Sequence, residues 1–214
     1  GFPDPNIASE EVTAITIKID GRYYALGCND FDCPDGVEYI QCKNEVELLK
    51  RFLDLWTLSY PDIITGWSVK FFDIPYLVNR ISRMLGEKEM AKLSPWGRVS
   101  QRTNTVMGRE KGFYDILGVS TLDYIELYRK FAPGGASQES YKLNHIANIE
   151  VGEKKISYEE YDNLHQLYRL NYQKFMEYNI HDVRLVEKID DKLKLIELAL
   201  TLAYDSKTNY DDVF

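Results

Sequence analysis

Short runs rich in β-branched residues alternate along the chain with longer stretches whose apolar residues recur every three or four positions. The first pattern is typical of strands and the second of amphipathic helices. The strand-like runs lie at residues 12–19, 22–26, 38–41, 63–66, 101–107, 112–117 and 119–128. The helix-like stretches lie at residues 44–59, 74–85, 141–149, 158–177 and 179–204, with a shorter piece ending near residue 93. Because the two kinds of element intermix without an internal repeat, the pattern predicts one α/β domain around a mixed sheet.

Local signals place several boundaries of these elements. Asp20-Gly21 separates the first two strand-like runs and predicts a hairpin turn. Asn44 and Glu47 form a capping box at the start of the first helix, and Gly86 stops the second helix. The polar residues 108–111 predict a turn between two neighbouring strands.

Composition narrows the class of protein. The chain has 214 residues, of which 44% are hydrophobic, enough for one globular domain with a sizeable core. No apolar run approaches the length of a membrane span and no signal peptide opens the chain, so we expect a cytoplasmic protein. We also expect a monomer. The chain begins at Gly1, inside a turn-like stretch and without an initiator Met, so we expect a cut from a longer protein.

The charges are unevenly distributed. The net charge of −8 argues against nucleic-acid binding by bulk electrostatics alone. Residues 79–111 nevertheless hold eight basic and three acidic residues, so this segment carries +5 and the remainder −13. A basic segment beside an acidic body could bind an anionic polymer and hold it next to a metal-binding site. A solvated helix and hairpin is equally compatible with these charges.

The cysteines and histidines show no metal-binding pattern. Cys28, Cys33 and Cys42 are spaced by four and then eight residues, which fits no zinc motif and favours reduced thiols. The three histidines include no pair spaced by four residues. They are interpreted as ordinary surface or core residues.

One acidic residue, Asp73, stands between a strand-like run and a helix-like stretch. With Pro75 just inside the helix, Asp73 occupies an N-cap position, and capping is one interpretation. An acid at a strand-to-helix junction can also hold a metal ion near a ligand. The two roles are compatible because a carboxylate has spare lone pairs. The preceding aromatics, Phe71 and Phe72, are typical of core packing.

A second acidic residue, Asp182, lies four residues after Tyr178, so the two side chains share one face of a helix. Leu185, Val186 and Ile189 continue that face and would turn it toward the core. Burying an unpaired acid is costly, and a metal ion or a cationic partner removes that cost. The alternative is an acid in the first turn of a helix, favoured by the helix dipole.

Together these residues form longer motifs. Phe72-Asp73-x-Pro75-Tyr76, followed much later by Tyr178-x-x-x-Asp182, resembles the second and third exonuclease motifs of family B DNA polymerases. Essentially the whole chain is similar to the replicative polymerases of large tailed bacteriophages. The further segments that carry the resemblance are Thr65-Gly66-Trp67, Asn79-Arg80-Ile81, Lys92-Leu93-Ser94-Pro95, Leu122-Asp123-Tyr124-Ile125 and Tyr178-Asn179-Ile180.

The resemblance implies a ribonuclease H-like fold with an inserted β-hairpin and a proofreading 3′→5′ exonuclease acting on a single-stranded DNA primer terminus. Two Mg²⁺ or Mn²⁺ ions would hydrolyse the terminal phosphodiester. Asp73 and Asp182 would converge as metal ligands, and Tyr178 would orient the attacking water. Residues 102–117 would form a hairpin that parts primer from template. The implied DNA contacts are Phe2, Ser68, Phe72, Arg102, Arg109 and Lys111.

Two features depart from the family pattern. The first exonuclease motif, an Asp-x-Glu, is absent, and we interpret residues 1–214 as a single exonuclease domain that begins after it and is cut before the polymerase domain. Ser68 stands where the family usually has Asn. Without the acids of the first motif, we expect the isolated chain to bind metal poorly and to degrade DNA slowly or not at all.

Other interpretations stay open. One is a catalytically degenerate nucleic-acid-binding or scaffold domain of the same fold, which Ser68 favours and the presence of all three motif residues disfavours. Another is a free-standing nuclease, which is disfavoured because residues 210–214 resemble a segment that leads on to the polymerase. No polymerase motif is present, so nucleotide addition would belong to the rest of the parent polymerase, the expected partner.

Overall fold

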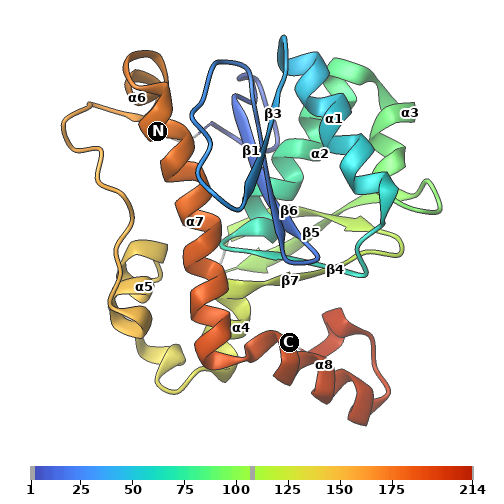
Figure 1. Cartoon of the computed structure of the whole chain (residues 1–214). Coiled ribbons are helices and arrows are strands. Elements are labelled where there is room, and N and C mark those ends of the chain that lie inside the picture. The colour runs from blue at the N-terminus through green and yellow to red at the C-terminus, as the bar shows by residue number, and fades with distance from the viewer. Residues whose placement is uncertain (1–2, 107–108, 214) are drawn as a thin grey trace. The chain divides into compact units, whose positions relative to one another are not determined.

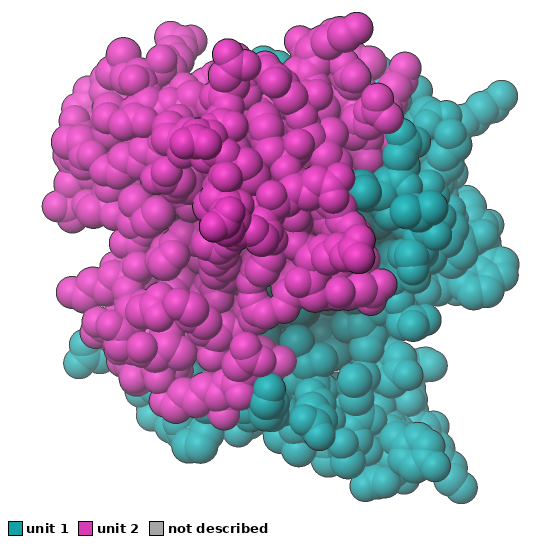
Figure 2. Space-filling view, in the orientation of Figure 1, with its two compact units in different colours: residues 1–11, 53–139, 193–214 teal, residues 12–52, 140–192 magenta. Residues whose placement is uncertain are grey.

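The computed structural model describes residues 3–106 and 109–213. Two compact units make up the chain (Figures 1 and 2). The first unit contains Gly1–Glu11, Leu53–Glu139 and Leu193–Phe214, and the second contains Val12–Phe52 and Ser140–Lys192. Among the described residues, no helix combines the length and the apolar character needed to cross a membrane.

The second unit contains a three-stranded sheet. Strands β1 (Ala14–Ile19) and β2 (Arg22–Gly27) are antiparallel, and β3 (Val37–Gln41) pairs with β2 in parallel. Asp20 and Gly21 join β1 to β2 with positive φ angles of 48° and 80°, the combination that a tight two-residue hairpin requires. The predicted hairpin turn is therefore confirmed.

Helix α7 (Tyr172–Leu193) packs against this sheet (Figure 1). Ala25 on β2 meets Met176 and Ile180 on α7 in a buried cluster. Two shorter helices, α5 (Leu143–Val151) and α6 (Leu164–Leu170), precede α7. The unit also holds the start of α1 (Glu45–Leu58), where the amide of Glu47 donates to Asn44 Oδ1 at 3.0 Å, as the capping box predicts.

In the first unit, two short parallel strands end at the same edge. Strand β4 (Ile63–Gly66) pairs with β7 (Ser120–Asp123), and Gly66 lies opposite Asp123 in the register. A π-helical turn, η1 (Val69–Asp73), follows β4 and runs directly into α2 (Ile74–Leu85). Helix α4 (Tyr124–Phe131) follows β7 without a break. Both the turn η1 and the start of α4 therefore lie at the carboxyl ends of the strands.

The remaining elements of the first unit include an antiparallel pair, β5 (Val99–Val106) and β6 (Arg109–Ile116). Strand β6 contacts α2 through a hydrogen bond from the Tyr114 hydroxyl to Asn79 Oδ1, 2.6 Å long. The short elements are α3 (Glu87–Met90), η2 (Ala91–Leu93), η3 (Gly135–Ser137), α8 (Leu195–Ser206) and η4 (Tyr210–Val213).

Four predicted elements need correction. The strand predicted at 119–128 ends at Asp123, because the Asp123 side chain caps α4. The helix predicted at 158–177 is wrong in its first half, since residues 152–163 are irregular and α7 begins only at Tyr172. The helix predicted at 179–204 is broken at Lys194, whose φ is 53°. Residues 109–111 of the predicted polar turn belong to β6, and residues 107–108 lie outside the described residues.

At the level of class, the structure is a mixed α/β arrangement of small sheets and helices, as the sequence predicts. In the described part of the chain, the strands group as β1-β2-β3, β4-β7 and β5-β6. The finer expectation, a ribonuclease H-like fold with one mixed central sheet, stays a prediction.

Candidate active site

Asp73 lies at the end of the π-helical turn η1. The amide of Ile74 donates to the carbonyl of Val69, which closes the wide turn. Single π-helical turns occur frequently at functional sites. Asp73 has helical backbone angles (φ −63°, ψ −49°), and its exposed side chain makes no capping hydrogen bond. Capping by the Asp73 side chain is therefore wrong, because the π turn continues into α2.

Aromatic contacts surround the turn that carries Asp73. Phe71 meets Phe113 of β6 edge to face, with ring centroids 6.2 Å apart. Phe72 stacks on Tyr76 of α2 at 6.0 Å. Both phenylalanine side chains make aromatic contacts but are only partly buried, so neither belongs to the fully buried core that was expected. A DNA contact by Phe72 stays a prediction.

Ser68, immediately before this turn, adopts a left-handed backbone conformation (φ 70°, ψ 21°). Few residues other than Gly, Asn and Asp adopt this conformation without strain. The position therefore favours Asn over Ser on backbone grounds alone. A DNA contact by Ser68 stays a prediction.

In the second unit, Tyr178 and Asp182 lie on one face of α7, and both contact Lys155, a residue that the sequence did not single out. Lys155 forms an ion pair with Asp182 Oδ2, and its ammonium also donates to the Tyr178 hydroxyl at 3.0 Å. The same ammonium lies 5.0 Å from the centroid of the Tyr178 ring. The Tyr158 ring packs edge to face on Tyr178, with centroids 5.4 Å apart. One acid, one base and one phenol thus form a single cluster.

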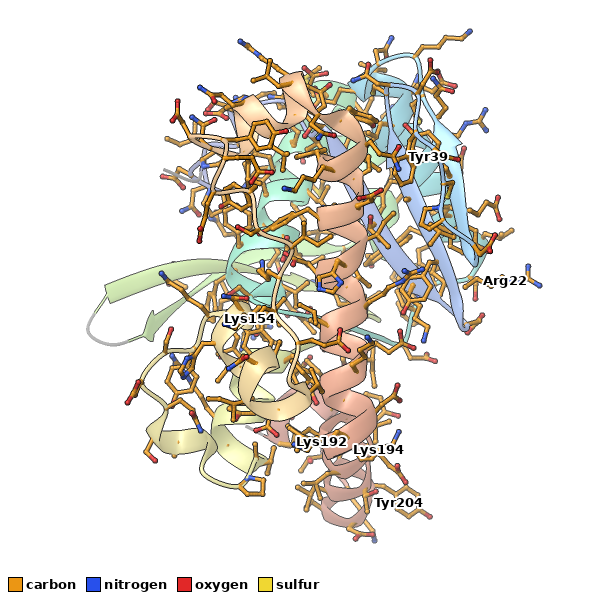
Figure 3. All side chains as sticks on the ribbon, turned by 60° about the vertical axis from the view of Figure 1, so that its left-hand side comes forward. Arg22, Tyr39, Lys154, Lys192, Lys194 and Tyr204 are labelled. Carbon is orange, nitrogen blue, oxygen red and sulfur yellow. The ribbon has the colours of Figure 1, made fainter. Side chains whose placement is uncertain are left out.

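Lys155 belongs to the irregular segment that follows α5, and this segment is tied to α7. Figure 3 labels Lys154 on this segment and Lys192 farther along α7. His181 Nε2 lies 2.9 Å from the carbonyl oxygen of Lys154. Lys188 pairs with Glu153 at 2.6 Å, and Lys192 pairs with Glu150 at 2.9 Å. These contacts hold Lys155 opposite Asp182.

Burial sets the electrostatics of the cluster. Burial raises the pKa of Asp182, and the ammonium of Lys155 offsets part of that rise. Burial alone would lower the pKa of Lys155, but the charge of Asp182 and its hydrogen bonds outweigh this effect and raise it. Burial and the nearby Asp182 charge raise the pKa of Tyr178, so its phenol stays protonated near neutral pH.

Asp182 is not a first-turn acid. Helix α7 begins at Tyr172, so Asp182 lies well inside the helix, beyond the reach of its N-terminal dipole. Leu185 and Ile189 are fully buried below it, as the apolar face predicts. The cationic partner that the burial of an acid requires is Lys155.

The Asp182 carboxylate has one oxygen that Lys155 does not contact. In the part of the chain that the structure describes, Oδ1 of Asp182 is buried without a hydrogen-bond partner. An orphaned carboxylate oxygen is an oxygen donor of the type that Mg²⁺ and Mn²⁺ prefer. The exposed carboxylate of Asp73 is a donor of the same type. Each carboxylate by itself is thus of the right chemical type, although the described residues contain no group of three or more His, Cys, Asp or Glu side chains that could hold a metal ion.

Of the DNA contacts predicted on strands β5 and β6, the structure describes the side chain of Arg102 but not those of Arg109 and Lys111. Arg102 on β5 forms an ion pair with Asp115 of β6 at 2.5 Å, while 63% of its side chain stays exposed. Arg109 and Lys111 lie on β6, but their side chains lie outside the described residues. Phe2 also lies outside the described residues.

The structure brings Tyr178 and Asp182 together and places Asp73 in the other compact unit. Convergence of Asp73 with Asp182 stays a prediction. Sequence reasoning missed Lys155, because it lies in an irregular segment with no fixed spacing to either motif. It also missed the structural use of Asp123, an acid at a strand-to-helix junction, the same signal that drew attention to Asp73.

The sequence of the chain was compared with protein-family models. The model of the DNA polymerase family B exonuclease domain matches residues 1–146. The chain belongs to this family. The match includes Asp73 and η1, whereas Tyr178 and Asp182 lie beyond it.

Individual relatives named as DNA polymerases match the chain beyond residue 146, over nearly its whole length. The chain is 34% identical to the DNA-directed DNA polymerase of Enterobacteria phage T4 over 99% of its length, which is 26% of that polymerase. It is 33% identical to the DNA-directed DNA polymerase of Escherichia phage RB69 over 100% of its length, again 26% of the relative. A DNA polymerase catalytic subunit of Psittacid herpesvirus 1 is 29% identical over 76% of the chain and 15% of the relative. The chain thus spans about a quarter of the length of the two phage polymerases.

Proposed function

We propose that this chain is the proofreading 3′→5′ exonuclease part of a DNA-directed DNA polymerase, with a ribonuclease H-like fold. It hydrolyses the terminal phosphodiester of a single-stranded DNA primer end. The observation that carries the proposal is the Asp182–Tyr178–Lys155 cluster, in which a partly buried carboxylate, an ammonium and a phenol lie together. The family assignment supports the same activity.

Each residue of the cluster has a distinct role in this proposal. Asp182 would hold a metal ion through Oδ1, while its Oδ2 pairs with Lys155. Lys155 keeps a positive charge beside the carboxylate, which favours the approach of the anionic DNA backbone. Tyr178, protonated and fixed by Lys155 and Tyr158, orients the attacking water through its hydroxyl.

Asp73 is the second proposed ligand, and the remaining carboxylates come from an Asp-x-Glu segment upstream of Gly1. Two divalent ions bound by these oxygens would supply charge stabilisation and an activated water. Phe2, Ser68, Phe72, Arg102, Arg109 and Lys111 are the proposed DNA contacts, and β5 and β6 form the hairpin that parts primer from template. The partner is the rest of the polymerase chain, and the proposed location is the cytoplasm of the host cell.

The test uses the chain extended upstream of Gly1 by a segment that carries the Asp-x-Glu acids. A 5′-labelled single strand is incubated with this protein and Mg²⁺, and the expected result is stepwise shortening from the 3′ end. Asp182→Ala and Asp73→Ala in the extended protein should each lower the rate by about a hundredfold or more, because each removes a metal ligand.

Matched controls separate the site from the fold. Asp191→Ala changes an exposed acid on the same helix as Asp182, and Asp62→Ala changes an exposed acid shortly before η1. Both should keep the wild-type rate. An extended protein that folds but shortens no DNA at any Mg²⁺ concentration contradicts the proposal and favours a degenerate, DNA-binding domain.

A further inference from the structure

A buried acid outside the proposed metal site lies beside the turn that carries Asp73. Asp123 ends β7 and is only 1% exposed. Because β4 and β7 are parallel and Gly66 lies opposite Asp123, its carboxylate lies where the chain leaves β4 toward η1. A buried carboxylate is costly unless it is hydrogen-bonded, so its contacts indicate what it does.

The two carboxylate oxygens of Asp123 bind different segments. Oδ1 accepts the amide of Ile125 at 3.0 Å and thereby caps α4. Oδ2 accepts the amide of Lys70, in the middle of η1, also at 3.0 Å. A further backbone hydrogen bond to the carboxylate comes from Ser68. The same side chain therefore joins the start of α4 to the turn that ends at Asp73.

The first turn of α4 makes two more contacts with this segment. Lys70 Nζ pairs with Glu126 Oε2 at 2.9 Å. The Trp67 ring stacks on Tyr124, with centroids 6.2 Å apart. Residues 67, 68 and 70 are thus each held by α4 or its cap.

A cap alone does not require this arrangement. Ser, Thr or Asn caps a helix as well as Asp does, and one acceptor atom is enough. The strained backbone of Ser68 persists only where its surroundings fix it, and the hydrogen bond to Asp123 supplies such a constraint. A cap needs only one acceptor, and Ser68 needs a constraint that Asp123 supplies. We therefore attribute the carboxylate at position 123 to its contacts with the turn η1 rather than to capping of α4.

We infer that Asp123 is a positioning residue for Asp73: by binding the backbone of Ser68 and Lys70 it fixes the π-helical turn and so the metal ligand at its end. The inference rests on the proposed function, because it assumes that Asp73 binds metal. The role inferred for Asp123 is structural, since it is 1% exposed and backbone donors bind both of its oxygens.

The decisive variant is Asp123→Asn. The Asn carbonyl can still cap α4, but its NH₂ group cannot accept the Lys70 amide. In the 214-residue chain, we expect the amide resonances of residues 68–73 to shift and the Lys70 amide to exchange with solvent about tenfold faster. In the extended protein, Mn²⁺ binding measured by electron paramagnetic resonance should weaken about tenfold, and high Mg²⁺ should restore most of the rate of digestion.

The control is Ile116→Val, which removes one methylene from a side chain that is 2% exposed and leaves the turn untouched. Unchanged resonances for residues 68–73 in Asp123→Asn, or equal loss of Mn²⁺ binding in Ile116→Val, would overturn the inference. If Asp123→Asn does not fold, Asp123→Ser, which keeps one capping oxygen for α4 in place of the two carboxylate oxygens, should still speed exchange at Lys70, and wild-type exchange there overturns the inference. If the extended wild-type protein does not bind Mn²⁺, the proposed function is wrong. The amide measurements would still show whether Asp123 fixes the turn.

Discussion

Replacing Lys155 with Met tests the electrostatic core of the candidate site. The change keeps a long apolar stem but removes the only charge-bearing group that contacts both Asp182 and Tyr178 in the described cluster. Breaking a fully buried ion pair costs about 3–5 kcal/mol, whereas breaking an exposed pair costs at most about 1 kcal/mol. The side chains of Lys155 and Asp182 are each 25% exposed, so the pair falls between these limits. We expect Lys155→Met to lower the free energy of unfolding by about 2 kcal/mol.

The assay is urea unfolding of the wild type, Lys155→Met, Asp182→Asn and the double variant. The double variant should be less destabilised than the sum of the two single variants, by about 1–2 kcal/mol, because the second change removes the uncompensated charge left by the first. Lys188→Met is the matched control, since Lys188 pairs with Glu153 on the same two segments but both side chains are more than 40% exposed. It should cost less than about 1 kcal/mol. If Lys155→Met costs no more than Lys188→Met, the reasoning about a buried pair is refuted.

Three further changes test other parts of the molecule. Ser68→Asn should raise the free energy of unfolding by about 0.5 kcal/mol, and Ser68→Val should lower it by about 1–2 kcal/mol. The reason is that Asn adopts the left-handed backbone far more readily than Val does. Equal stabilities of the two variants in urea would contradict this prediction. Burial raises the pKa of the Cys42 thiol to about 11. Its rate of alkylation by iodoacetamide, followed by mass spectrometry, should therefore be very low at pH 8 and rise about tenfold per pH unit toward pH 11. Rapid labelling of Cys42 at pH 8 would contradict the burial of this thiol. Gly27→Ala should lower the free energy of unfolding by about 2–3 kcal/mol, because the new Cβ would lie 2.0 Å from the Tyr172 hydroxyl oxygen. The loss should be smaller in a Tyr172→Phe background. Equal losses in both backgrounds, measured by urea unfolding, would contradict this contact.

The elements that the sequence predicts well are those whose boundaries are encoded locally. Helix α2 runs from Ile74 to Leu85, as predicted, because Pro75 and Gly86 mark its two ends. The hairpin at Asp20-Gly21 is equally local. The prediction fails at residues 119–128, which have the composition of a strand. Asp123 Oδ1 accepts the amide of Ile125 and caps α4, so the strand ends at Asp123.

The same division explains which site residues were predicted. Tyr178 and Asp182 are four apart on one helix, so their spacing alone places them on one face. Lys155 reaches that face from an irregular segment whose position depends on pairs such as Lys188–Glu153, and no local spacing encodes such a segment. What local sequence does encode is the need for a partner, because an acid above a buried apolar face cannot stay unpaired at low cost. The sequence thus specified a cation at Asp182 without specifying which one. The structure supplies Lys155 at one carboxylate oxygen and leaves the other oxygen as the proposed position for a metal ion.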